Sequence, residues 1–185
     1  MRPPTLKTDR FVIRAFERED LLSFAKYRAH EDIARYQSWV DFSLQDAIDF
    51  FNSMDYSNFG AEGNWYQLAI ASAIDGELLG DIAVHFIDKD QIEIGFTISP
   101  LHQGQDIATD AISIFLGYAF SDLKKHRTIA ITDTRNQASV RLLEKLGFRR
   151  EGHFIENIFF KGEWGDEYLY ALLRNENKLR TQKCA

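Results

Sequence analysis

The chain has 185 residues, of which 45% are hydrophobic and 27% charged, and its formal net charge is −6. This length predicts one domain, residues 1–185, with a sizeable core, and the acidic balance argues against a nucleic-acid-binding protein. The single cysteine, Cys184, excludes an intramolecular disulfide and a cysteine-based metal site. No apolar run approaches the ~20 residues that span a bilayer, so we expect a cytoplasmic protein that does not enter the membrane.

The first third of the chain predicts one strand followed by two main helices. Residues 10–16 alternate as a strand, and an acidic first turn opens a helix over residues 17–29. A short helical turn is expected at residues 31–36. Ser43 followed by Asp46 has the pattern of a capping box, which predicts that the second main helix begins after Ser43. The polar stretch 55–63 is predicted to be a loop.

The rest of the chain predicts a meander of three strands and then a mixture of helices and strands. The meander covers residues 65–72, 77–87 and 92–98, and Asp75-Gly76 is a hairpin signal within it. A long helix from Asp106 and a helix over 136–146, with Gly147 as its C-cap, flank a short strand at 128–133. Strands at 148–160 and 167–173 follow, and the polar tail 175–185 is expected to be frayed. This order predicts an α+β domain around one mixed, mainly antiparallel sheet of about seven strands flanked by helices.

Residues 91–119 combine a buried strand, a turn around Pro100 and Gly104, and the start of the long helix. Backbone N–H groups at such a helix N-terminus can bind an anion such as a pyrophosphate. The alternative is an ordinary connection between a strand and a helix, because glycine-containing turns are common.

Asp106 bears on both interpretations of this turn. As an N-cap residue, its carboxylate would satisfy the N–H groups that a phosphate would use. Beside an anionic ligand its charge would cost about 1 kcal/mol at 4 Å in water, and about 4 kcal/mol at an effective dielectric near 20. The turn could instead point Asp106 outward and leave Gly104 for the close approach of the ligand.

The chain resembles the GNAT family of N-acetyltransferases and, within it, the RimJ/RimL branch that acetylates the N-termini of ribosomal proteins. The family motif Gln/Arg-x-x-Gly-x-Gly/Ala stands here as residues 103–108, QGQDIA, with Asp106 in place of the central glycine. The block at 136–148, NQASVRLLEKLGF, is the most specific match, and the resemblance covers nearly all of residues 5–175. Further matching blocks are Thr8–Arg14, Glu93–Phe96, Glu151-Gly152 and Gly162–Trp164.

This resemblance implies a GNAT-like fold whose fourth and fifth strands splay apart to hold acetyl-CoA, with no metal. The amine acceptor would be a protein N-terminus or a small amine, and the acidic surface would tolerate a polyamine or an aminoglycoside. A backbone N–H of the fourth strand would stabilise the oxyanion. The residues expected to bind the cofactor are Phe96, Thr97, Ile98, Gln103, Gly104, Gln105, Asp106, Ile107, Ala108, Thr109, Asn136 and Ser139.

Ser139 is the candidate for protonating the departing thiolate, because Leu143 stands where many relatives have the tyrosine that does so. The alternative is a small surface residue, and for Asn136 it is a plain helix N-cap. Glu93 and Glu156 are the two candidates for the base that deprotonates the amine. Some relatives carry a catalytic glutamate two positions after Glu156, where this chain has Ile158. For Glu93, exposure to solvent is the alternative.

His85 and Trp39 are expected to contact the acceptor. A non-catalytic binding protein on the same fold stays open if Asp106 fills the anion site, and so does an interaction domain whose strand gap pairs with a peptide. The five histidines lack metal-ligand spacing, and no P-loop or Gly-x-Ser-x-Gly motif is present. Dimers are common in the resembling family, which leaves a homodimer open.

Overall fold

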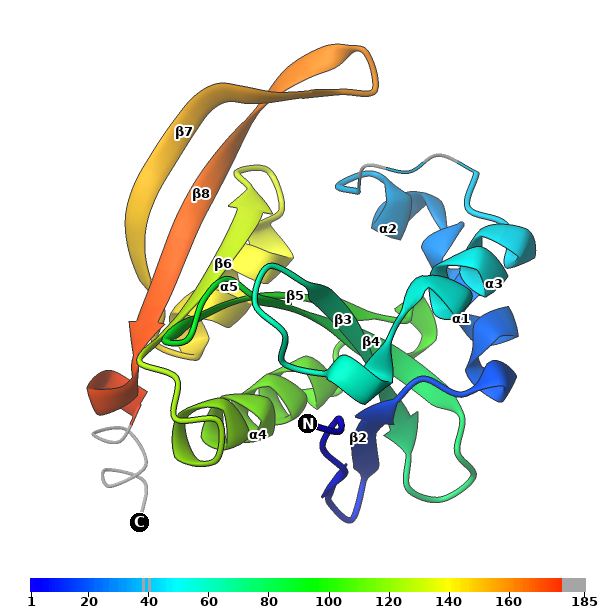
Figure 1. Ribbon diagram of the computed structural model, residues 1–185. Coiled ribbons are helices and arrows are strands. Elements are labelled where there is room, and N and C mark those ends of the chain that lie inside the picture. Colours follow the sequence, from blue (N-terminus) through cyan, green and yellow to red (C-terminus); the bar gives the residue numbers. More distant parts are fainter. Residues whose placement is uncertain (38, 40, 178–185) are drawn as a thin grey trace.

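The computed structural model describes residues 1–37, 39 and 41–177. Within them, eight strands form one sheet in the order β1-β2-β3-β4-β5-β6-β8-β7 (Figure 1). All neighbouring strands are antiparallel except β5 and β6, which are parallel. The strands are β1 Leu6–Lys7, β2 Phe11–Ala15, β3 Trp65–Ser72, β4 Leu78–Phe86, β5 Gln91–Ile98, β6 Arg127–Asp133, β7 Arg149–Phe160 and β8 Glu163–Leu173.

The mixed, mainly antiparallel α+β sheet is the predicted one, and the additional strand is β1. Its two residues are too few to show an alternating pattern, so only the pairing of Leu6 with Ile13 and of Lys7 with Val12 reveals it. None of the described helices is long and apolar enough to cross a membrane.

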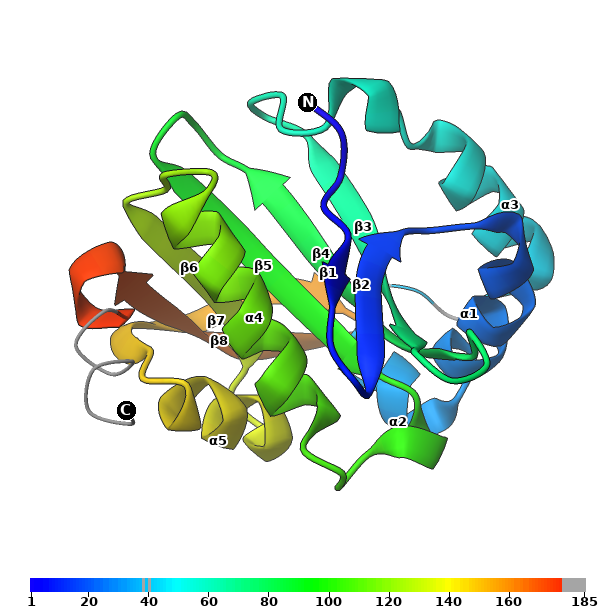
Figure 2. The same ribbon diagram turned by 90° about the horizontal axis from the view of Figure 1, so that it is seen from below.

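Helices cover both faces of the sheet. Helices α4 (Ile107–Ser121) and α5 (Gln137–Lys145) lie on one face, and their apolar side chains share a buried cluster with strands β2 to β6 and β8 (Figure 2). Helices α1 (Leu21–Arg28) and α3 (Leu44–Ser53) pack together in a second cluster that includes Ala69 of β3. The short α2 (Glu31–Ala34) follows α1, and three 3₁₀ turns span Arg18–Asp20, Tyr56–Asn58 and Pro100–His102.

Two local sequence signals are confirmed at helix ends. The Ser43 amide donates to the Asp46 carboxylate at 2.7 Å and the Asp46 amide donates to Ser43 Oγ at 3.2 Å, which is the capping box predicted for α3. After α5, the amides of Gly147 and Phe148 donate back into the last turn, to the carbonyls of Glu144 and Leu143. Gly147 has φ +85°, the left-handed conformation that this type of helix end requires.

Strands β5 and β6 pair over only three residues each, Gln91–Glu93 with Arg127–Ile129, and then diverge. Beyond Glu93, β5 therefore keeps one neighbour, β4. The Ser99 amide donates to the Leu79 carbonyl at 2.9 Å, and the β4–β5 register is unbroken. Because N–H groups alternate sides along an antiparallel strand, those of Phe96 and Ile98 point into the gap between β5 and β6.

The described chain ends in one helical turn at residues 174–177. In this turn the Glu176 carboxylate accepts a hydrogen bond from the Leu173 amide at 2.9 Å. The remainder of the tail predicted to be frayed, including Cys184, lies outside the described residues.

Two glycine-to-alanine substitutions should change stability in opposite directions. Gly117→Ala lies inside α4 with no atom within 4 Å of the added Cβ, so we expect it to raise the free energy of unfolding by about 1 kcal/mol. Gly147→Ala places a Cβ in the left-handed region and should lower it by about 1 kcal/mol. Urea denaturation of both variants measures the difference, and changes of the same sign would contradict this account.

Candidate active site

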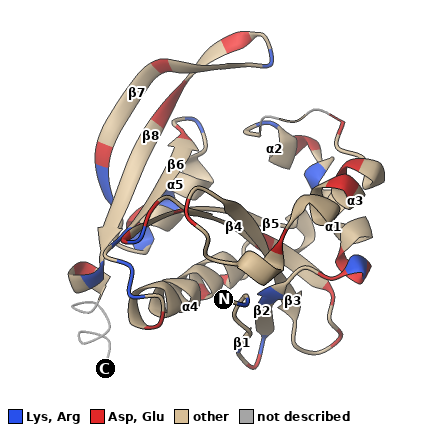
Figure 3. Cartoon of the chain, viewed as in Figure 1, with Lys and Arg blue, Asp and Glu red and all other residues tan. Residues whose placement is uncertain are grey.

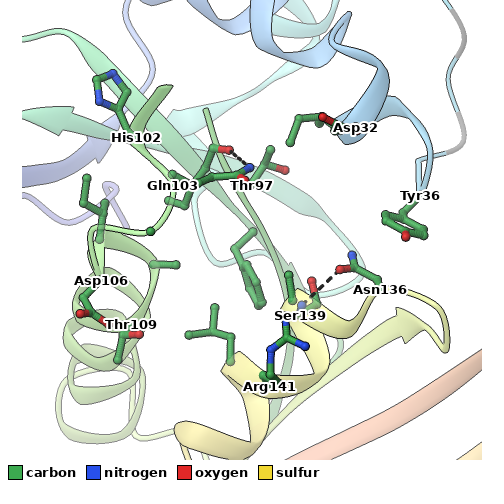
Figure 4. A pocket seen from close by; sticks show the side chains of 18 of the residues that line it. Asp32, Tyr36, Thr97, His102, Gln103, Asp106, Thr109, Asn136, Ser139 and Arg141 are labelled. Carbon is green, nitrogen blue, oxygen red and sulfur yellow. Dashed lines mark hydrogen bonds between the residues drawn. The ribbon is translucent and has the colours of Figure 1, made fainter. Parts of the chain in front are cut away.

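A cavity of about 530 Å³ lies between the end of β5, the loop before α4, and helices α2, α4 and α5 (Figure 4). Every residue predicted to bind the cofactor lines it except Gln105. The other lining residues were not predicted to bind the cofactor; four come from α2 and the segment after it, and four lie close in sequence to predicted residues. They are Asp32, Ile33, Tyr36, Gln37, His102, Ala138, Arg141 and Leu142.

Gln105 does not line this cavity, and its backbone connects the loop to Arg10, the residue before β2. Its backbone carbonyl accepts a hydrogen bond from Arg10 Nη2 at 2.7 Å. The same guanidinium donates through Nη1 to the Asp110 carboxylate at 2.9 Å, so Arg10 joins the loop to the first turn of α4.

The N-terminus of α4 is not capped by a side chain. Asp106 has φ +58° and makes no capping hydrogen bond, so of the two interpretations of this turn the structure excludes the one in which the carboxylate caps the helix. The first intrahelical bond runs from the Asp110 amide to the Asp106 carbonyl, which leaves the amides of residues 107–109 without intrahelical partners. Gly104 has φ +73°, a conformation that favours glycine at this turn.

The Asp106 carboxylate instead accepts a hydrogen bond from Lys145 Nζ of α5 at 2.7 Å. This contact holds the pKa of Asp106 below its usual range, and 68% of the side chain is exposed. The negative charge is therefore paired at the rim of the cavity, and the carboxylate does not fill the anion site. The non-catalytic alternative, which depended on that filling, loses its basis.

Lys, Arg, Asp and Glu are interspersed over the molecule (Figure 3). Any positive potential at the cavity therefore comes from individual nearby groups. Arg141 of α5 lines the cavity on the side of Ser139 (Figure 4). With the free amides at the start of α4, it gives an acidic chain a site where an anion can bind.

Asn136 and Ser139 stand where α5 begins. Asn136 Oδ1 accepts a hydrogen bond from the Ser139 amide at 3.2 Å, so the helix-cap interpretation of Asn136 is confirmed. Gln103 Nε2 donates to the Ile98 carbonyl at 3.0 Å, at the gap edge of β5. Leu143, at the position of the tyrosine in many relatives, is only 1% exposed.

A second cavity, of about 600 Å³, opens on the other side of the gap and meets the first. Both are lined by Tyr36, Gln37, Phe96, Thr97, Asn136 and Ser139. About half of the residues that line the second cavity are aromatic or aliphatic, with Trp39 among them. The lining also contains four carboxylates: Asp81, Glu93, Asp133 and Glu167.

Two of these four carboxylates are held by arginines. Asp81 of β4 lies 3.4 Å from Arg28 Nη2, and Asp133 of β6 lies 2.8 Å from Arg135 Nη2. Asp133 is therefore compensated without a ligand, whereas burial raises the pKa of Asp81 even though Arg28 acts to lower it.

The other two, Glu93 of β5 and Glu167 of β8, lack an arginine or lysine partner in the described part of the chain. Glu167 accepts a hydrogen bond from Asn157 Nδ2 at 2.6 Å. Glu93 Oε2 lies 3.8 Å from Nδ1 of His85, which is directly opposite on β4. Burial raises the pKa of Glu93, while the nearby His85 acts to lower it and Glu167 raises it further.

His85 does not line either cavity. It lies behind Glu93 and stacks on Trp65, with ring centroids 4.7 Å apart and an interplanar angle of 10°. It therefore supports the wall of the cavity, in contrast to the direct acceptor contact that was expected.

Glu156 is also outside both cavities. It sits in a bulge of β7 with φ +47°, is exposed, and donates its amide to Asp166 Oδ1 at 2.8 Å. Ile158, two positions later, lines the second cavity. The bulge changes which side chains of β7 face inward, and no sequence pattern indicated it. In the residues the structure describes, no group of three or more His, Cys, Asp or Glu could hold a metal.

Two cavities meet where β5 and β6 diverge, and comparison with known proteins gives the family of the chain. The family model described as acetyltransferase (GNAT) domain matches residues 10–149. The uncharacterized N-acetyltransferase YnaD of Bacillus subtilis is 31% identical over 172 residues, which are 92% of this chain and 98% of YnaD. The spermidine N(1)-acetyltransferase of Vibrio cholerae is 26% identical over 174 residues, 92% of this chain and 97% of the relative.

A crystal structure of a GNAT-family acetyltransferase from Bacillus anthracis is 32% identical and has a TM-score of 0.82. The alignment covers 94% of this chain and all of that one. The chain therefore belongs to the GNAT family, and it is an acetyl-CoA-dependent N-acetyltransferase.

Asp106→Gly should strengthen the binding of acetyl-CoA, because it removes a negative charge near an anionic ligand. The gain should be less than tenfold, because that charge is exposed and already paired with Lys145. Lys145→Met should weaken binding roughly fivefold or more, because it leaves that charge unpaired near an anionic ligand. In the Asp106→Gly background, Lys145→Met should weaken the binding of acetyl-CoA by a smaller factor. Isothermal titration of the four proteins measures this coupling, and a tenfold gain in Asp106→Gly would show that the carboxylate crowds the ligand.

Proposed function

We propose that this protein transfers the acetyl group of acetyl-CoA directly to a primary amine in a ternary complex, with the two ligands in the two cavities. The observation that carries the proposal is the meeting of the cavities at Phe96, Thr97, Asn136 and Ser139, where β5 and β6 separate. Acetyl-CoA supplies the acetyl group as a thioester. The residues around the junction bind it, orient it and move protons.

The first cavity fits acetyl-CoA. The uncapped amides of residues 107–109 and the turn at Gly104 can receive the pyrophosphate, because neither is occupied by a side chain of the described residues. Arg141 adds a cation on the opposite wall. The Phe96 amide points into the gap, and it would donate to the oxygen of the thioester carbonyl and stabilise an oxyanion there.

Glu93 is the better placed of the two candidates for the base. Glu93 lines the second cavity, which we assign to the acceptor and call the acceptor cavity, whereas Glu156 does not line it. Three residues of strand separate Glu93 from Phe96, a rise of about 10 Å, so the proton would pass from the amine to Glu93 through water. Ser139 lines both cavities, and its hydroxyl would donate a proton to the departing thiolate.

The acceptor is a cationic primary amine. Glu93 and Glu167 give the second cavity two carboxylates that no arginine or lysine of the described chain compensates, and its aromatic residues suit an ammonium group. The Vibrio cholerae relative is by name a spermidine acetyltransferase. The sequence resemblance to the RimJ/RimL branch supports a protein N-terminus instead.

Titration with acetyl-CoA, followed by mass spectrometry of products, tests this function. Micromolar binding and a mass gain of one acetyl group on a primary amine are expected. The amine panel should include spermidine, an alanine N-terminal peptide and an aminoglycoside. Binding with no transfer to any amine would contradict the proposed catalysis, and no binding up to about a millimolar would remove the cofactor site.

Glu93→Gln should lower kcat by roughly 10²- to 10⁴-fold with unchanged affinity for acetyl-CoA. Because burial raises the pKa of Glu93, the wild-type kcat at saturating amine should fall as the pH drops through that raised value, and the variant should lose this limb. Glu156→Gln is the matched control and should keep the wild-type rate within twofold. A defect in the control but not in Glu93→Gln would assign the base to β7.

Ser139→Ala should lower kcat while the affinity for acetyl-CoA stays within about threefold. The hydroxyl is expected to act on the leaving group, and its loss should be felt less with a thioester whose thiol is more acidic. Comparing acetyl-CoA with such a thioester measures this, and an equal loss with both substrates would mean that Ser139 only shapes the cavity.

A further inference from the structure

Arg28, the last residue of α1, is a buried cation whose hydrogen-bonding capacity is largely unused. The residue is 8% exposed, its Nη2 donates to Asp81 Oδ1 at 3.4 Å, and its guanidinium also interacts with the Tyr27 hydroxyl. Nε is covered and has no hydrogen-bond partner in that part of the chain. A guanidinium carries five N–H donors, and buried donors are normally paired.

Aromatic rings hold this guanidinium in place. Its central carbon lies 4.2 Å from the ring centroid of Trp39 and 4.3 Å from that of Phe24, with Phe42 and Phe50 within 6 Å. The Trp39 indole N–H in turn donates to the Arg28 carbonyl at 3.1 Å. Because rings lie over the guanidinium, a ligand can reach its N–H donors only at the edge.

Asp81 cannot saturate these donors. It also accepts hydrogen bonds from the Tyr27 hydroxyl and from Gln67 Nε2, so its oxygens are shared among three partners. Arg28, Gln67 and Asp81 all line the acceptor cavity. The structure thus presents a built polar cluster in that cavity, with donors that lack an acceptor.

The position of this cluster in the cavity is informative. Asp81 is directly opposite Thr97 on β5, and Thr97 lines both cavities. The cluster therefore lies near the point where the acetyl group meets the amine. Glu93 is four residues back along β5, about 13 Å away.

We propose that Arg28 binds an oxygen of the acceptor, a carbonyl or carboxylate attached to the carbon that bears the amine. This inference rests on the proposed function and narrows its acceptor to an aminoacyl group. A polyamine has no oxygen and would leave the guanidinium donors unpaired. Discrimination against a substrate that leaves buried polar groups of the site unpaired is typically large.

Wild-type enzyme tests this without risk to the fold. Alaninamide and isopropylamine are matched in shape around the amine and differ in the carbonyl group. Free alanine separates a carboxylate from a carbonyl, and an alanine N-terminal peptide and spermidine complete the panel. With kcat/KM expressed per neutral amine, we expect an oxygen-bearing acceptor to exceed isopropylamine roughly tenfold or more.

The double variant Arg28→Met/Asp81→Asn removes the guanidinium without leaving a buried unpaired carboxylate. Its preference for alaninamide over isopropylamine should fall below threefold, with unchanged affinity for acetyl-CoA as the sign of an intact fold. Arg28→Lys is the second test, for use if the double variant does not fold. It keeps the charge with fewer donors and should lose most of the preference. Arg18→Met, outside the cavities, is the control and should keep the preference.

Equal rates with isopropylamine and alaninamide in the wild type would overturn the role of Arg28 but leave an N-acetyltransferase. A preference for alaninamide over isopropylamine that survives in both Arg28 variants would also overturn the role of Arg28 and leave an N-acetyltransferase. Binding of acetyl-CoA with no transfer to any member of the panel would overturn both the inference and the proposed function.

Discussion

The site depends on a sheet that stops pairing halfway along two neighbouring strands. Backbone N–H and C=O groups inside a protein are almost always paired, and β5 departs from this rule only beyond Glu93. Gln103 satisfies the Ile98 carbonyl there, but the amides of Phe96 and Ile98 still face the gap. Both cavities exist because β6 turns away, and the donors that line the gap are a direct product of the same divergence.

A second constraint acts at the start of α4, where the chain must leave helix amides open to a ligand. An N-capping side chain would stabilise the helix and close the site. The left-handed backbone at Asp106 turns the carboxylate towards α5, where Lys145 pairs with it. Although the chain has a net charge of −6, the amides at the start of α4 remain open to an anionic ligand. Lys145 pairs with Asp106, the one acidic residue of the motif.

The sequence predicted what depends on local pattern and on family resemblance. The long helices, the capping box at Ser43, the C-cap at Gly147 and many of the residues that line the first cavity are of this kind. It did not predict features that depend on backbone conformation at single residues. The sequence left open whether Asp106 caps α4 or points outward, which its positive φ decides, and the bulge at Glu156 carries that residue away from the second cavity. Arg28 was missed because the carboxylate that it contacts, Asp81, lies on β4, 53 residues further along the chain.

The gap between β5 and β6 also links ligand occupancy to folding. A ligand that accepts hydrogen bonds from the amides of the gap and of the α4 N-terminus would complete pairing that the protein leaves unfinished. Such a ligand binds the native state only, and at a hundred times its Kd it adds about 2.7 kcal/mol to the free energy of unfolding. By this thermodynamic linkage, the supply of acetyl-CoA would raise the fraction of the chain that is folded as well as the rate at which it works.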